Sequence, residues 1–287
     1  MAADPAVDPT VRSLADELEQ AYARGQVLPS PPSARERGLT LETAYDVEAE
    51  LARRRLATGH RAVGLKVGFA NKAMWRILKL ETLVWAHMYD DTVHAVPASR
   101  ATLRLAGRVA PRIEPEIVFS LSRTPDPAAT DPAAVLTAVE WMALGFEIND
   151  CVFPAWKFQP ADFVAAYGFH TALFVGPPRP PRSSDAEALA TCGVRLSRNG
   201  QLVEEGSGKN ALRSPALCLA ELVGALSRQT RDAKEARSAR RVTTEPLVAG
   251  DLVSTGTLTT AQPIAPGETW RADVDALALP PLTLDVT

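Results

Sequence analysis

The feature that most constrains this chain is a change in the spacing of its apolar residues at Gly64. Before Gly64, residues 11–23 and 41–56 carry apolar side chains at helical spacing, and Thr40 stands in the N-cap position of the second segment. After Gly64, most segments are short, β-compatible and bounded by Gly or Pro. We therefore expect an α+β fold, in which helical residues 1–62 pack on a mixed, strand-rich core of residues 63–287 as one integrated domain.

The core is expected to alternate between strands and a few helices. Its expected elements are strands at residues 103–121, 145–150 and 170–176, a hairpin around Asn199-Gly200, helices at residues 133–144 and 214–228, and short strands from residue 246 onward. Residues 230–246 are polar, with five Arg/Lys between Arg231 and Arg241, and are interpreted as a solvated helix extension or a loop.

Composition excludes several classes of protein. The 287 residues are 46% hydrophobic, which is enough to build a sizeable core. The net charge of −3 offers no basic excess for a nucleic-acid partner. No apolar run approaches the roughly 20 residues that span a bilayer, and no secretory signal is visible. Cys151, Cys192 and Cys218 are too widely spaced to indicate a disulfide framework or a zinc site. These features favour a cytoplasmic enzyme.

The sharpest local motif is RIEPEIVF, which contains Glu114 and Glu116. Side chains alternate between the two faces of a strand, so these carboxylates would lie together on one face. Two carboxylates so close disfavour each other's ionisation, and a hard divalent cation such as Mg²⁺ or Mn²⁺ would relieve that conflict. Pro115 cannot donate to a ladder, which indicates an edge strand or a bulge. The alternative is the solvated face of an ordinary strand.

Glu147 strengthens the metal interpretation. It lies in the apolar segment ALGFEIND, where an unpartnered carboxylate would be costly to bury. A cation shared with Glu114 and Glu116 would provide a partner. A salt bridge to Arg108 or Arg112 is the alternative.

Three further segments could contribute to a site. Lys66 lies between Leu65 and Val67 in GLKVGF, where partial burial would let it donate or accept a proton, or it could extend from a strand edge to solvent. Ser207-Gly208 in EEGSGKNAL offers backbone amides for an anion, and Thr255-Gly256 in LVSTGTLT offers donors for a substrate carboxylate. Either loop could equally be a plain turn.

Taken in order, these motifs resemble a known family. GLKVGF, NKAM, ETLVWAHM, RIEPEIVFSL, LGFEIND, EEGSGKNAL and GDLVSTGTL follow one another as in the 2-keto-4-pentenoate hydratase and 4-oxalocrotonate decarboxylase family, within the fumarylacetoacetate hydrolase superfamily. The resemblance spans about residues 10 to 286. It implies a helical N-terminal part on a distorted β-roll or barrel-like core, in a homo-oligomer.

The resemblance also implies the roles of individual residues. Mg²⁺ or Mn²⁺ would be bound by the two ExE glutamates and a third glutamate, and an active-site lysine and a carboxylate-binding TG loop would complete the site. The matching residues here are Glu114, Glu116, Glu147, Lys66, Thr255 and Gly256.

Two departures leave the substrate open. His87 stands where relatives often carry an acidic residue, and Ala165-Ala166-Tyr167 replaces an ADN-like stretch. We count His87 with Lys66 and Glu147 as a candidate catalytic group. The favoured function is hydration of a small 2-oxo or 2-hydroxydienoic acid. The alternatives are a 4-oxalocrotonate-type decarboxylase, a fumarylacetoacetate- or acylpyruvate-type C–C hydrolase whose base would be His87 or His170, and a catalytically silent acid-binding or assembly protein.

Overall fold

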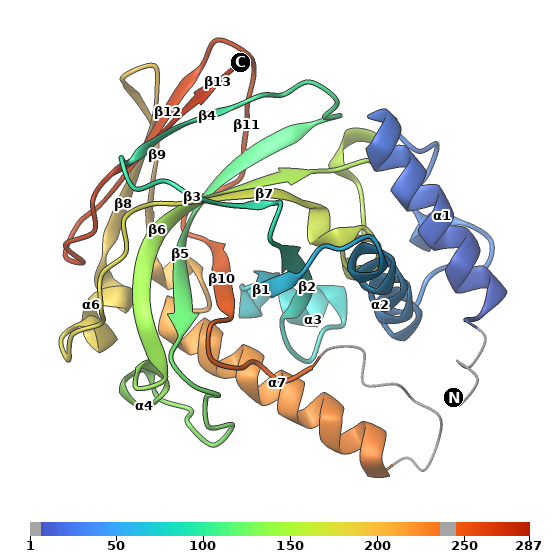
Figure 1. The fold of residues 1–287 in the computed structure, drawn as a ribbon, viewed down its shortest axis with the longest axis horizontal. Helices are drawn as coiled ribbons and strands as arrows, with labels where there is room; N and C mark the ends of the chain where they lie inside the picture. The colour runs from blue at the N-terminus through green and yellow to red at the C-terminus, as the bar shows by residue number, and fades with distance from the viewer. Residues whose placement is uncertain (1–6, 236–244) are drawn as a thin grey trace.

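The computed structural model describes residues 7–235 and 245–287 (Figure 1). Its α-helices are α1 (Pro9–Arg24), α2 (Leu41–Ala57), α3 (Lys72–Leu78), α4 (Pro132–Leu136), α5 (Pro160–Ala165), α6 (Asp185–Thr191) and α7 (Pro215–Glu235). Single 3₁₀ turns are η1 (Pro32–Ala34), η2 (Pro154–Trp156), η3 (Tyr167–Phe169) and η4 (Gly208–Asn210). Among the described residues, no helix is both long and apolar enough to cross a membrane.

The strands form two sheets within the described residues. The larger has the order β2 (Val84–Tyr89), β1 (Ala62–Gly68), β10 (Leu252–Thr257), β5 (Pro111–Leu121), β6 (Val139–Asp150), β7 (His170–Val175) and β3 (Val93–Ala95), with β11 (Gln262–Pro263) also paired to β5. The smaller has the order β4 (Arg100–Leu103), β13 (Leu282–Val286), β12 (Thr269–Val274), β8 (Gly193–Arg198) and β9 (Gln201–Ser207). The larger sheet curls strongly, which confirms the α+β expectation and its barrel-like core (Figure 1).

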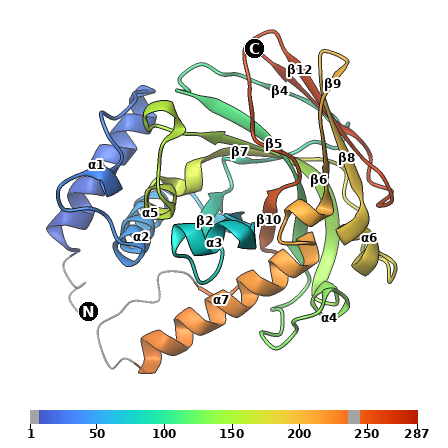
Figure 2. The same cartoon turned by 180° about the vertical axis from the view of Figure 1, so that it is seen from behind.

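The helices cover this curled sheet on different sides. In Figures 1 and 2, α1 and α2 lie together beside β2 and β7, while α7 runs along the opposite end of the sheet, below β10. One hydrophobic cluster joins side chains of α1 and α2, such as Leu18 and Leu51, to sheet residues such as Phe119 and Phe146. A domain division at residues 62 and 63 stays a prediction.

The two N-terminal helices were predicted from local signals, and the structure confirms them. The Asp8 side chain accepts a hydrogen bond from the Thr10 amide at the start of α1, and Gly25 ends the helix in the left-handed conformation. Thr40 caps α2 through the Thr43 amide. The hairpin at residues 199 and 200 is also confirmed, with positive φ at both positions.

The predicted helix at residues 133–144 is wrong. Helix α4 stops at Leu136, and Val139 begins a strand that pairs with β5 along almost its whole length. Strand β6 lies between two other strands and is buried on both faces from Met142 onward, so its apolar run is nearly continuous. In such a run the spacing of apolar residues cannot distinguish a buried strand from a buried helix.

The predicted strand at residues 103–121 is two strands. Strand β4 ends at Leu103, a loop containing Gly107 follows, and β5 begins at Pro111. The expected edge position of Pro115 is wrong as well, because β5 pairs with β10 on one side and β6 on the other. A bulge does lie nearby, but in the neighbouring strand: the β10–β5 register shifts between Ser254 and Thr257, opposite Ile117.

The charged stretch at residues 230–246 is only partly described. Helix α7 begins at Pro215 as expected and continues to Glu235, so the first part is a helix extension. Residues 236–244 lie outside the described residues.

Replacing Gly64 by alanine should destabilise the fold strongly. Gly64 has φ +147°, and a Cβ there would lie 1.9 Å from the Leu252 carbonyl oxygen in the adjacent strand β10. We expect Gly64→Ala to lower the free energy of unfolding by at least about 3 kcal/mol, measured by urea denaturation. Gly59→Ala is the matched control, because Gly59 also has positive φ but open space around it. Equal losses in the two variants would contradict the close approach of β1 to β10.

Candidate metal centre

Three glutamates from two strands meet in the larger sheet, as the sequence predicted. Glu114 on β5 lies directly opposite Glu147 on β6, and Glu116 follows on the same face of β5. One carboxylate oxygen from each of the three lies within 4.8 Å of the others. This is a set of hard oxygen ligands of the kind that Mg²⁺ and Mn²⁺ prefer.

Glu147 is paired with a lysine and a histidine rather than with an arginine. Its Oε2 lies 2.8 Å from Lys66 Nζ, and its Oε1 lies 2.9 Å from His170 Nδ1. Burial alone would raise the pKa of Glu147, but the positive charge of Lys66 and the hydrogen bond from His170 outweigh it and lower the pKa to about 2. The predicted alternative of a salt bridge is wrong for Arg112, whose guanidinium stacks on Trp156 instead.

The pKa values of the other two carboxylates are raised, whereas that of Glu147 is lowered. Burial, together with the charge of Glu147, raises the pKa of Glu114 from its ordinary value of 4.5 to about 7, although Lys66 offsets part of the effect. Burial and the two neighbouring glutamates raise the pKa of Glu116 further. The positively charged side chains around the site are therefore too few to keep all three carboxylates ionised.

The unsatisfied atoms of Glu116 fit a cation. Its Oε2 accepts hydrogen bonds from the Ser254 hydroxyl at 2.5 Å and the Gly256 amide at 2.9 Å. Its Oε1 is buried and has no hydrogen-bond partner among the described residues. A buried carboxylate oxygen without a donor is costly, and a divalent ion shared with Glu114 and Glu147 would satisfy it.

Asn149 orders this cluster, and it was not predicted from the sequence. Its Oδ1 accepts from Lys66 Nζ at 2.9 Å, and its Nδ2 donates to Glu114 Oε2 at 2.6 Å. A signal was present in the sequence, because Asn149 lies two residues after Glu147 and so shares its face of β6.

Lys66 is almost completely buried and held at three points. Its ammonium group donates to Glu147, to Asn149 and, at 3.0 Å, to the Gly168 carbonyl. That carbonyl is positioned by a left-handed stretch, in which Tyr167, Gly168 and Phe169 all have φ between 56° and 58°. An ammonium group has three hydrogens, so the donors of Lys66 are fully used in this arrangement.

A cavity of about 220 Å³ lies beside the glutamates. Glu114, Lys66, Asn149 and Gly256 line its polar side. Its opposite side is aromatic and is formed by Phe69, Trp156, Phe158, Phe163 and Phe169. Sequence reasoning missed this aromatic wall, because only the tertiary fold brings the connection between β6 and β7, which carries four of these residues, over the glutamates and next to Phe69.

Three of the predicted substrate-binding residues make other contacts. The Thr255 hydroxyl donates to the Ile117 carbonyl, and the Ser207 hydroxyl accepts from the Lys209 amide, so neither is directed into the cavity. Gly208 is packed against the Leu189 carbonyl. Gly256 does line the cavity, but its amide serves Glu116 rather than standing free for a substrate carboxylate.

The structure does not bring His87 to the glutamates. Lys66 is in register with Ala86, so strand alternation directs the His87 side chain to the other face of β2. There its Nδ1 lies 2.7 Å from Glu48 Oε1 of α2. Burial would lower the pKa of His87, but the charge of Glu48 outweighs it and the pKa is raised.

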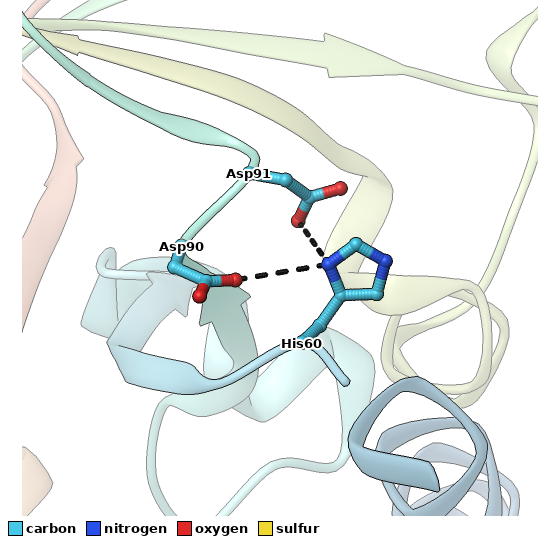
Figure 3. Close-up of side chains that lie close together, drawn as sticks. All are labelled: His60, Asp90 and Asp91. Atoms are coloured by element: carbon cyan, nitrogen blue, oxygen red, sulfur yellow. Dashed lines mark ion pairs between the residues drawn. The ribbon is translucent and has the colours of Figure 1, made fainter. Parts of the chain in front are cut away.

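A second group of possible metal ligands lies at the surface (Figure 3). His60 Nδ1 is 3.7 Å from Asp90 Oδ1 and 3.5 Å from Asp91 Oδ1. Asp90 also pairs with Arg61, and Asp91 pairs with Arg55. A cation would have to compete with both arginines, so these three residues act as an ion-pair cluster at the start of β1.

The metal-free protein should lose stability as the pH rises. Glu114 has a pKa of 4.5 when unfolded and about 7 in the fold, so between these values the unfolded chain binds fewer protons than the folded chain. We expect the free energy of unfolding, measured by urea denaturation in chelator, to fall across this window, with about 3 kcal/mol of the loss due to Glu114.

Two variants isolate the cause. Glu114→Gln should reduce the pH dependence without abolishing it, because the pKa of Glu116 is raised as well. Glu140→Gln, at an exposed position of β6, should leave it unchanged. Added Mn²⁺ should restore stability at the upper end of the window. A pH dependence identical in both variants would contradict a buried, proton-binding Glu114.

Comparison with known proteins agrees with this geometry. The family model described as fumarylacetoacetate (FAA) hydrolase C-terminal matches residues 70–284. A 2-hydroxypent-2,4-dienoate hydratase of Pseudomonas putida is 32% identical over 221 residues, covering 75% of this chain and 95% of the relative. A 4-oxalocrotonate decarboxylase of Pseudomonas sp is 27% identical over 267 residues, covering 93% and 95%. The structure of 4-oxalocrotonate decarboxylase from Pseudomonas putida G7, complexed with magnesium and adipate, matches with a TM-score of 0.81 at 25% identity over 97% of both chains. The chain therefore belongs to the fumarylacetoacetate hydrolase family, as the order of its motifs indicated.

Proposed function

We propose that the protein is a divalent-metal-dependent lyase that hydrates a small 2-hydroxydienoic acid with an uncharged tail. The observation that carries the proposal is the convergence of Glu114, Glu116 and Glu147, with one buried oxygen of Glu116 lacking a partner among the described residues. The relatives named hydratase and decarboxylase, one of them solved with magnesium, support the same reaction class.

The three glutamates would hold the cation. When bound, Mg²⁺ or Mn²⁺ supplies Lewis-acid stabilisation of negative charge that develops on a substrate oxygen. The protein contributes the arrangement: Asn149 fixes Glu114, Ser254 and the Gly256 amide fix Glu116, and Lys66 with His170 fixes Glu147. These hydrogen bonds keep the carboxylates in place without the cost of reorganising them during the reaction.

Lys66 has two roles in this proposal. In the resting arrangement its ammonium group is the buried positive charge that offsets the glutamates. Hydration requires a proton to be delivered to the substrate, and Lys66 lines the cavity where the substrate would lie. If a substrate atom took the place of the Gly168 carbonyl or of Asn149 Oδ1 next to Nζ, one N–H of Lys66 would point at that atom and could donate a proton to it.

The aromatic wall favours a hydratase over a decarboxylase of the 4-oxalocrotonate type. A dicarboxylate substrate would place a second negative charge against Phe158, Phe163 or Phe169. Lys66 is the one cationic side chain among the described residues that line the cavity, and Glu147 already holds it. A second carboxylate would therefore lose its hydration without gaining a counter-charge. A vinyl or alkyl tail incurs no such cost.

A C–C hydrolase and a silent assembly protein receive less support. A C–C hydrolase needs a base for water attack, but neither His87 nor His170 is among the described residues that line the cavity. A silent assembly protein would have no need of buried carboxylates whose pKa values are raised by their neighbours.

From the family resemblance, we also propose that the enzyme is a homo-oligomer and that it is cytoplasmic. Size-exclusion chromatography with light scattering would test the oligomeric state.

Turnover should depend on Glu116. Protein in Mg²⁺ mixed with 2-hydroxypenta-2,4-dienoate should consume the dienol, followed by its ultraviolet absorbance. Because Glu116→Gln removes a metal ligand, we expect kcat/KM to fall more than about 100-fold, beyond the loss typical of residues that only support a ligand. Glu140→Gln is the matched control and should retain activity. Full activity of Glu116→Gln, or metal-independent turnover, would overturn the proposal.

Substrate preference should follow the charge of the tail. We expect kcat/KM for 2-hydroxypenta-2,4-dienoate to exceed that for 4-oxalocrotonate by at least about 10-fold, because the second carboxylate finds no free cationic side chain among the described residues that line the cavity. Parallel measurements of dienol loss and of CO₂ release would decide this. Faster decarboxylation than hydration would assign the protein to the decarboxylase branch instead.

A further inference from the structure

A second cavity, of about 470 Å³, lies between α1, α2, β2 and the start of β7. It is larger than the glutamate cavity, and the described residues that line the two cavities do not overlap. Six of its lining residues determine what it can bind: Tyr22, Arg55, Tyr89, Arg108, Tyr167 and His170. The His87 side chain faces this cavity as well.

Most charged side chains around this cavity already have an ion-pair or hydrogen-bond partner, whereas Arg108 forms no ion pair with a described residue and interacts with the charge of Asp150 only beyond ion-pair distance. Arg55 pairs with Asp91, and Glu19 pairs with Arg54. The Asp150 carboxylate accepts hydrogen bonds from two backbone amides, at residues 109 and 110. Arg108 donates to the Arg104 carbonyl and lies 3.5 Å from the Thr171 hydroxyl, and it forms no ion pair with any described carboxylate.

Unpartnered buried atoms gather at the same place. Tyr89 is 3% exposed, lines the cavity, and its hydroxyl has no hydrogen-bond partner among the described residues. Arg55 Nε, on another lining residue, is also buried without a hydrogen-bond partner among the described residues. So is Oε2 of Glu48, which does not line the cavity itself but contacts the lining residue His87. Buried polar groups are nearly always satisfied, so this concentration indicates a ligand that supplies the missing contacts.

The walls of the cavity suit a flat ligand. Tyr22 and Tyr167 meet edge to face, with ring centroids 5.6 Å apart. The Tyr89 ring lies under the Arg55 guanidinium, 4.6 Å from its centroid. Aromatic rings and guanidinium planes stack on planar conjugated molecules, and an arginine without a counter-ion binds a carboxylate strongly.

We propose that this cavity is a second binding site, separate from the glutamate cavity, for a small planar carboxylate with an aromatic or conjugated body. The carboxylate contacts Arg108 and the planar body lies among Tyr22, Tyr89 and Tyr167. His170 lines the site and also contacts Glu147 and Thr92, so the new site adjoins the proposed catalytic cluster and shares His170 with it, while its cavity is separate. The proposal does not depend on which reaction the protein catalyses.

The test uses benzoate as the probe and the full-length protein dialysed against chelator, so that no metal can bind the carboxylate. Isothermal titration calorimetry should show saturable binding of benzoate and none of benzyl alcohol, which has the same ring without the charge. Arg108→Gln should weaken benzoate binding at least about 10-fold, the loss expected for one charged hydrogen-bond partner. Arg104→Gln is the matched control, since it removes an exposed arginine four residues away and should change nothing.

Further variants keep the outcome decisive. If Arg108→Gln does not fold, as judged by thermal unfolding, Tyr167→Leu should weaken benzoate binding about 3- to 10-fold through the lost ring contact. Glu114→Gln should leave benzoate binding unchanged. The proposal is overturned if benzoate does not bind, if benzyl alcohol binds equally well, or if binding responds to Glu114→Gln but not to Arg108→Gln or Tyr167→Leu.

Discussion

The structure depends on gathering three carboxylates around one buried ammonium group. Glu116 and Glu147 are fully buried in the middle of a sheet, Glu114 is partly buried beside the cavity, and Lys66 supplies the buried compensating charge. An arrangement of this kind is stable only if every remaining lone pair finds a donor. Strands β1, β5, β6 and β10 are adjacent in the sheet, and each contributes a charged group or a donor to this cluster.

The elements around this cluster supply its hydrogen-bond donors and its aromatic wall. The bulge in β10 brings the Ser254 hydroxyl and the Gly256 amide onto one oxygen of Glu116. The connection from β6 to β7 returns over the cavity and supplies most of its aromatic side chains. The polar half of the site is therefore built by the sheet, and the apolar half by the segments that leave it.

The parts predicted from sequence are those that local alternation determines. Two glutamates spaced by two residues share a face on any strand, and an isolated glutamate or lysine among apolar neighbours must find a partner wherever the fold places it. The family resemblance then supplied the pairing between distant segments. Helix α1 was likewise predicted from an apolar spacing that is local to its own residues.

The sequence-based predictions that failed concern features that depend on strand register and on which segments pack next to each other. Residues 139–144 pair with β5, and from Met142 onward both faces of the strand are buried, which the segment itself cannot reveal. Thr255 was selected as a donor in a turn and His87 as a departure from the family pattern, yet the Thr255 hydroxyl is turned to a backbone carbonyl and the His87 ring to a glutamate of α2. The aromatic wall was missed because Phe69 and Phe163 lie far apart in the chain.

The left-handed turn at residues 167–169 has a consequence for engineering this protein. Three successive residues there have positive φ, and the Tyr167 and Phe169 side chains diverge into the two separate cavities. A directed-evolution library at Phe169 can thus reshape one chamber while its neighbour Tyr167 stays untouched in the other. Gly168, between them, cannot be varied in the same way, because even the methyl group of alanine would lie 2.9 Å from Ala86 and from the aliphatic part of Lys66.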